Sequence, residues 1–210
     1  MKTRASTLAT MLITSIGILV VSGAFLDAST VTASSGVGRL SATSSVATEA
    51  DRDAMVDALA KGDYAKAKKL HKKGVSFDAL SPSDDMTGLM RLADDGIEEA
   101  AAEVLKLGAN INARNTVGES AVWYATYSGH EKLALSLITR GASVAGQRPD
   151  SKECLLHMAV QADLLALSKK LMKITPECAA VKDSEGNTPA AIAKAMGYSK
   201  IAKIVSSRKK

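Results

Sequence analysis

The chain has 210 residues, of which 46% are hydrophobic and only 3% are aromatic, so its core has to be built from Ala, Leu, Val, Ile and Met. This composition favours helices that pack closely over small side chains, and it does not favour a large β-sandwich or β-barrel. The formal net charge of +5 includes Lys2 and Arg4 of a segment that we expect to be removed, and the remaining +3 is too small to indicate nucleic-acid binding.

The N-terminal segment has the composition of a secretory signal peptide. Lys2 and Arg4 precede an uncharged stretch over 5–26, whose most apolar part is 11–21. Small residues follow at 22–24 and again at 31–33, where a signal peptidase can cleave. We therefore predict a signal peptide over residues 1–24. An uncleaved signal anchor is the alternative, because the uncharged run is just long enough to cross a bilayer.

Residues 25–50 are rich in Ser, Thr and Ala and have no hydrophobic periodicity. Such a stretch cannot bury enough apolar surface to fold, so we predict a disordered linker. Phe25 followed by an acid-poor Ser/Thr tract also resembles the bipartite plastid-targeting leaders of some algae. The linker of a secreted or periplasmic protein is the favoured interpretation.

From Asp51 onward one pattern recurs with a period of 33–34 residues. One series of glycines marks a break between two helical segments, and Asp163 stands midway in its long last interval. A second series of glycines marks the end of the second segment. The first series is Gly62, Gly96, Gly129 and Gly197, and the second is Gly74, Gly108 and Gly141. A fixed period with this internal order predicts stacked helix–turn–helix units, none of which can bury its apolar face alone.

Several segments resemble the ankyrin repeat signature. Thr188-Pro189-Ala190 and Leu156-His157-Met158-Ala159 are similar to parts of T-P-L-H-x-A, Gly129-His130 matches its G-H step, and 108–113 is similar to its G-A-D-x-N-A loop. The resemblance implies an all-α, ankyrin-type solenoid of five stacked repeats over 51–207. The expected repeats are 51–82, 83–115, 116–149, 150–183 and 184–207.

The two end units depart from the pattern as capping units do. Four charged residues make the first helix polar on one side, and a basic tail at 208–210 ends the chain. The fourth unit is the most eroded, since Asp163 and Thr175 replace glycines. The turn that enters this unit, 145–153, lacks the usual D-x-x-G arrangement, so we expect it to be irregular.

The residues that carry chemistry favour structural roles. His130 and His157 occupy positions where ankyrin repeats use histidine to tie neighbouring loops, which is what the resemblance implies for them. Cys154 and His157 lie one helical turn apart, but no second pair of ligands accompanies them, so we expect no metal, no cofactor and no catalysis. Cys154 and Cys178 are either two free thiols, which we favour, or a disulfide closing the fourth unit.

The ankyrin resemblance implies a concave surface, formed by the first helices and the turns, that binds a partner protein. Tyr124 and Tyr127 are amphipathic anchors of the kind enriched at interfaces. Trp123 stands in the slot of the signature histidine, so we expect it to point inward. Acidic residues gather around the tyrosines, which favours a partner with basic character. The expected partner-binding residues are Arg91, Asp94, Asp95, Glu119, Tyr124, Tyr127, Met158 and Gln161.

The sequence therefore predicts a non-catalytic, monomeric protein-binding module that is exported through the secretory pathway and is secreted or periplasmic. One alternative is a scaffold that an uncleaved anchor holds at a membrane. Another is an accessory subunit of an exported enzyme. A plastid location through the bipartite leader is a further alternative for the compartment. We expect contact with a membrane only if the leader is uncleaved.

Overall fold

The computed structural model describes residues 47–207, and within this range the chain is all-α, as predicted. Ten α-helices and one 3-10 helix follow one another, and the described range contains no β-strand. The predicted signal peptide, nearly all of the predicted linker and the basic tail at 208–210 lie outside the described residues. The helices are α1 Glu49–Ala60, α2 Tyr64–Lys72, α3 Gly88–Asp94, α4 Glu98–Lys106, α5 Ala121–Tyr127, α6 Glu131–Thr139, α7 Leu155–Gln161, α8 Leu165–Ile174, η1 Pro176–Ala180, α9 Pro189–Ala195 and α10 Ser199–Ser206.

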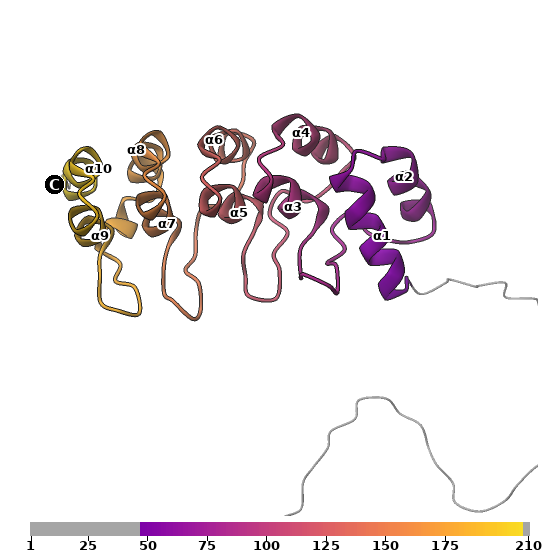
Figure 1. Cartoon of the computed structure of the whole chain (residues 1–210), viewed down its shortest axis with the longest axis horizontal. Coiled ribbons are helices and arrows are strands. Elements are labelled where there is room, and N and C mark those ends of the chain that lie inside the picture. Colours follow the sequence, from indigo (N-terminus) through magenta and orange to yellow (C-terminus); the bar gives the residue numbers. More distant parts are fainter. Residues whose placement is uncertain (1–46, 208–210) are drawn as a thin grey trace, which may run out of the picture. The chain divides into compact units, whose positions relative to one another are not determined.

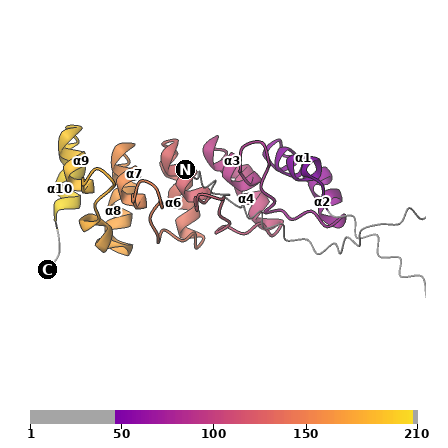
Figure 2. The ribbon, with the colours of Figure 1, turned by 90° about the horizontal axis from the view of Figure 1, so that it is seen from below.

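The helices of the described part are arranged in pairs that lie side by side in a row (Figures 1 and 2). In each pair an odd-numbered helix packs against the even-numbered helix that follows it. The odd-numbered helices also pack against one another from α1 to α9, so they form a continuous layer. The longer loops that join one pair to the next project beyond this layer (Figure 1). Surfaces on the loop side are therefore built from odd-numbered helices and loops.

Threonine side chains begin three of the odd-numbered helices. The hydroxyls of Thr48, Thr87 and Thr188 accept hydrogen bonds from the backbone N–H three residues later. Each bond satisfies a donor that the first turn of a helix leaves free. Because the carboxylate of Asp51 also accepts from the N–H of Thr48, α1 begins at Glu49. The helix thus begins two residues before residue 51, at which the sequence analysis places the start of the first repeat. Ser120 precedes α5 in the same way, but its hydroxyl makes no cap.

The turn between the two helices of a pair requires a residue with positive φ. Gly96 has a φ of +72° there, and a Cβ at this position would lie 2.5 Å from the imidazole ring of His130. Both conditions exclude most side chains. In the fourth pair Asp163 takes the same place with a φ of +54°. Aspartate is one of the few other residues that tolerate this conformation. The predicted replacement of glycine by Asp163 therefore preserves the turn.

The core consists of aliphatic side chains and methionines that fill the space between the two layers and between successive pairs. Val104, Leu137 and Leu171 are buried on the even-numbered helices, and their sequence neighbours are partly buried. Alanines such as Ala125 and Ala159 are fully buried on the odd-numbered helices, where small side chains allow close approach. None of the helices in residues 47–207 is long and apolar enough to cross a membrane.

The loop that enters the fourth pair is irregular, as predicted. Lys152 has a φ of +57°, and Gln147 and Cys154 form an isolated antiparallel bridge. Backbone hydrogen bonds join Arg148 N–H to the carbonyl of Glu153 and Lys152 N–H to the carbonyl of Arg148. These bonds hold the loop beside α5 and α7, where it contributes to a cavity.

Candidate functional site

A cavity of about 200 Å³ lies where α5, α7 and the irregular loop meet. The segment before α5 and α5 itself supply most of its wall, α7 supplies one methionine, and the loop supplies one arginine. Four of the predicted partner-binding residues line it together, although they come from two repeats. The lining residues are Glu119, Trp123, Tyr124, Tyr127, Arg148 and Met158.

The three aromatic side chains of α5 differ in exposure because they lie on different faces of one short helix. Trp123 is 2% exposed and points into the core, as predicted. Tyr127, one turn later, is 73% exposed, which is exceptional for a large aromatic side chain. Tyr124 is half-buried and packs against the core. Of the two predicted anchors, Tyr127 is therefore freely accessible, whereas Tyr124 is accessible only in part.

Hydrogen bonds fix the polar side of the cavity. The amide of Asn115 donates to the hydroxyl oxygen of Tyr124 at 3.1 Å and to the carboxylate of Glu119 at 3.2 Å. Burial, and after it the negative charge of Glu119, raises the pKa of Tyr124 to about 12. The phenol therefore stays protonated at neutral pH and keeps one hydrogen that it can donate.

Arg148 is the residue of this site that the sequence analysis missed. Its guanidinium lies 3.2 Å from the carboxylate of Glu119 and 3.6 Å from that of Asp150. Arg148 lies in the irregular loop before α7, and this loop does not follow the predicted repeat pattern. The pattern therefore gave no indication of where its side chain lies. The charge of Glu119 is thus largely matched within the protein.

Two buried N–H groups of the cavity wall make no hydrogen bond within the described part of the chain. They are Nε1 of Trp123 and Nε of Arg148. A buried donor without an acceptor lowers the stability of a fold. The cavity wall therefore combines an exposed aromatic ring and a methionine with two residues that each keep a buried N–H group without a hydrogen bond.

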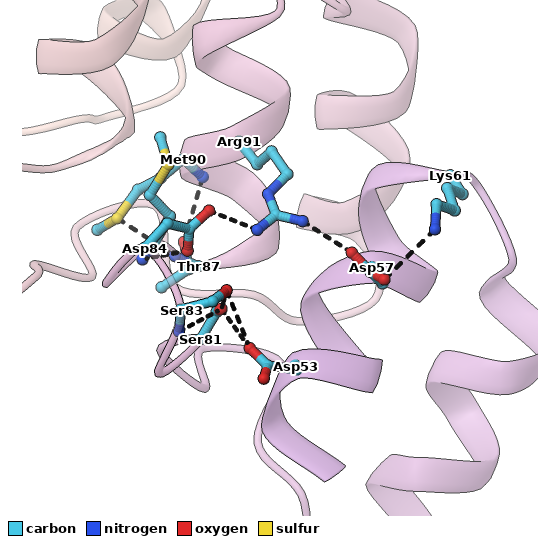
Figure 3. A network of polar contacts seen from close by, with 10 residues as sticks. Asp53, Asp57, Lys61, Ser81, Ser83, Asp84, Thr87, Met90 and Arg91 are labelled. Carbon is cyan, nitrogen blue, oxygen red and sulfur yellow. Dashed lines mark hydrogen bonds and ion pairs between the residues drawn. The ribbon is translucent and has the colours of Figure 1, made fainter. Parts of the chain in front are cut away.

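Of the other predicted residues, Arg91 is engaged inside the protein. Its guanidinium bridges Asp57 of α1, at 2.8 Å, and Asp84 of the loop before α3 (Figure 3). The prediction that Arg91 binds a partner is therefore not supported by its surroundings. The bridge ties the first two helix pairs together. Beside it, the carboxylate of Asp53 accepts hydrogen bonds from Ser81 and Ser83 (Figure 3).

We expect Arg91→Ala to lower the free energy of unfolding by about 1 kcal/mol, because the bridge is partly exposed to solvent. A hydrogen bond from Lys61, and further the charge of Arg91, lower the pKa of Asp57 below its ordinary value of 3.8. The contribution of Asp57 is therefore present above pH 3.8 and is lost as the pH falls through the lowered pKa.

Urea denaturation at pH 7 and at pH 2 checks this prediction. The stability difference between wild type and Arg91→Ala should shrink at the lower pH. Arg140→Ala, an exposed arginine at the end of α6, is the matched control and should change stability little. Equal stability of Arg91→Ala and wild type at pH 7 would show that the bridge does not stabilise the fold.

Asp94 and Gln161 are also bonded to other residues. The carboxylate of Asp94 accepts a hydrogen bond from Ser128, and its backbone carbonyl lies 2.8 Å from Nε2 of His130. The amide of Gln161 donates to Glu153 at 2.8 Å and lines a second cavity, which lies toward α9. Asp95, next to Asp94, is exposed at the end of α3. These residues lie apart from the cavity between α5 and α7.

The histidines have structural contacts, as predicted. Nε2 of His130 contacts the carbonyl of Asp94 in the second unit, and Nε2 of His157 lies 3.3 Å from the carbonyl of Asn187 in the fifth. His71 stacks on Phe77 with 4.2 Å between ring centroids. Among the described residues, no group of three or more His, Cys, Asp or Glu side chains could hold a metal ion.

No protein-family model and no curated protein sequence matches the chain.

Proposed function

We propose that the chain is an ankyrin-type repeat protein of five units that binds another protein and catalyses no reaction. The period of 33–34 residues supports this assignment, as do the paired helices and the positive φ at each turn within a pair. Repeats of this kind contact only their neighbours and present an extended surface to partners. We propose that the protein acts as a monomer and binds no nucleic acid.

The observation that carries the proposal is the cavity beneath Tyr127. An exposed tyrosine beside a pocket with a buried tryptophan and a methionine is the composition of an interface hot spot. The cavity is far smaller than a drug-sized ligand site, but it is large enough for one side chain of a partner. The partner's side chain would enter between α5 and α7, and Tyr127 would pack against it.

We propose a partner with basic character. Asp150, which lies beside Arg148 of the cavity, has 69% of its side chain exposed, and Asp95 is exposed farther away at the end of α3. The pairing of Glu119 with Arg148 reduces the negative potential inside the cavity, so the attraction comes mainly from acidic side chains outside it. Charges at the rim chiefly speed the encounter of the two proteins.

The export of the protein is part of the proposal and rests on the sequence of residues 1–24. We expect the protein recovered outside the cytoplasm to begin between Phe25 and Ser34, because small residues precede both predicted cleavage points. N-terminal sequencing of the exported form checks this. A membrane fraction that retains Met1 after a carbonate wash would support the anchored alternative instead.

Affinity capture with the purified protein tests the proposed function. Wild type, Tyr127→Ala and Ile174→Ala would each be incubated with extract of the producing cells and their medium, and the retained proteins would be identified by mass spectrometry. Ile174 is an exposed apolar residue at the end of α8, away from the cavity, so it is a matched control. The proposal requires a protein that wild type and Ile174→Ala retain and that Tyr127→Ala loses. Retention of the same proteins by all three variants would place the binding surface elsewhere.

A further inference from the structure

The only two cysteines of the chain meet in the fourth unit. Cys154 directly precedes α7, and Cys178 lies in η1, which follows α8. The sulfur of Cys154 lies 3.8 Å from the backbone carbonyl oxygen of Cys178. Cys154 is 0% exposed and Cys178 is 8% exposed, and both are free thiols in the structure. The chain between them folds back on itself, so 24 residues of sequence separate two neighbouring side chains.

The surroundings of Cys154 favour its reactive form. Nδ1 of His157 accepts a hydrogen bond from the backbone N–H of Cys154 at 3.2 Å and lies 3.3 Å from its sulfur. The neighbouring Cys178 thiol, acting against burial and together with His157, lowers the pKa of Cys154 to about 5. The hydrogen bond with Cys154, and after it burial, raises the pKa of Cys178. One thiol of the pair is thus prepared to attack, since the thiolate is the nucleophile in disulfide exchange.

We propose that Cys154 and Cys178 form an intramolecular disulfide when the folded protein meets a disulfide oxidant such as oxidised glutathione. The bridge would enclose α7, α8 and η1, which together make the fourth unit. This inference does not depend on the proposed partner or on export. It implies that the redox state of the compartment sets the stability of this unit.

The exchange balances without any other reactant. Cys178, the more exposed of the two, passes its proton to the Cys154 thiolate as it attacks oxidised glutathione, which forms a mixed disulfide and releases one glutathione as a thiolate that takes a proton from solvent. Cys154 then attacks the sulfur of Cys178, which breaks the mixed disulfide and releases the second glutathione, and the proton of Cys154 goes to that glutathione. Two protein thiols become one disulfide, and one oxidised glutathione becomes two reduced ones.

The bridge would act at the junction between the fourth and fifth units. η1 packs against α7, α8 and α9, so it lies between the two units. A backbone hydrogen bond of 2.8 Å from Ser184 to Ser151 joins the loops on either side of the same junction. Fixing η1 to the start of α7 reduces the number of conformations open to the unfolded chain. We therefore expect a more stable fourth unit with an unchanged helical fold.

Incubation of the full, folded protein in glutathione buffers of increasing oxidised fraction tests the proposal. Wild type should lose both thiols and give a single peptide pair linking Cys154 to Cys178 in non-reduced mass mapping. Its melting temperature should rise by roughly 5–10 °C and should return to the reduced value on addition of dithiothreitol. Cys154→Ser and Cys178→Ser should show no rise under the same buffers.

The same incubation in urea shows whether the fold brings the two cysteines together or whether they pair equally well in the unfolded chain. A bridge that forms in the folded protein at a lower oxidised fraction than in the unfolded chain supports the proposal. Wild type that stays reduced while folded, or that yields only glutathione adducts or cross-linked dimers, would overturn it. A bridge that leaves the melting temperature unchanged would also overturn the claim that it stabilises the fourth unit.

Discussion

Trp123→Ala should lower the free energy of unfolding by about 3–5 kcal/mol. Trp123 is 2% exposed, and it packs in the middle pair of helices, where α5 meets both α3 and α7. Its loss would leave a hole next to a cavity that already exists, so the surrounding side chains cannot refill the space by a small shift. Because α5 packs against the helices on both sides of it, damage at Trp123 weakens the contacts of the middle pair with both neighbouring pairs.

Chemical denaturation followed by far-UV circular dichroism measures this effect. Trp123→Phe is the matched control, because it keeps most of the ring and removes an indole N–H that is buried without a hydrogen-bond partner. We expect Trp123→Phe to cost much less than the alanine variant. A loss below about 1 kcal/mol in Trp123→Ala would mean that the tryptophan does not support the contact between neighbouring units.

The order of the helices could be predicted because glycines mark the period of this chain, and glycine readily adopts the positive φ that the turns require. Gly96 and Gly129 stop one helix and begin the next through positive φ, and no other feature of the sequence was needed to locate those turns. Asp163 could be assigned to the same role from its place in the period. The first residue of α1 could not be located, because the exchange of hydrogen bonds between Thr48 and Asp51 leaves no periodic signal.

The candidate site could be predicted only in part, since repeat spacing locates residues on a helix but not their partners. Glu119, Tyr127 and Met158 line one cavity, as expected for residues on the same side of neighbouring units. Arg91 holds in α3 the place that Met158 holds in α7, four residues after the residue that precedes the helix. Its side chain nevertheless pairs with Asp57 and Asp84. One of these partners, Asp57, belongs to the first helix pair, and the repeat pattern does not indicate which charges a neighbouring pair presents.

Arg148 was missed for a different physical reason. It belongs to a loop with no repeat register, and only the backbone bonds of that loop carry its side chain to Glu119. The pairing changes the character of the proposed site. Glu119 alone would make the cavity acidic, whereas Glu119 paired with Arg148 leaves an ion pair beside aromatic side chains. A basic side chain of a partner has to compete with Arg148 for Glu119, which makes specificity depend on the shape of the cavity as well as on charge.

Tyr127→Ala should weaken binding of the captured partner about tenfold, and Tyr124→Ala combined with it should weaken binding further. Tyr127 has most of its side chain exposed, so its removal should change stability by less than about 0.5 kcal/mol. Tyr124 is half-buried and hydrogen-bonded to Asn115, so its removal also costs stability. Thermal melts of each variant are therefore needed beside the binding isotherms.

Arg148→Gln shows which charge the partner brings to the site. The substitution leaves Glu119 without its ion pair, so a basic partner should bind about two- to fivefold more tightly and its binding should depend more steeply on salt. An acidic partner should bind more weakly, since it loses the guanidinium. Isotherms at two salt concentrations, with Ile174→Ala as the control away from the cavity, separate these outcomes. Unchanged affinity in both Arg148→Gln and Tyr127→Ala would show that the partner does not enter the cavity between α5 and α7.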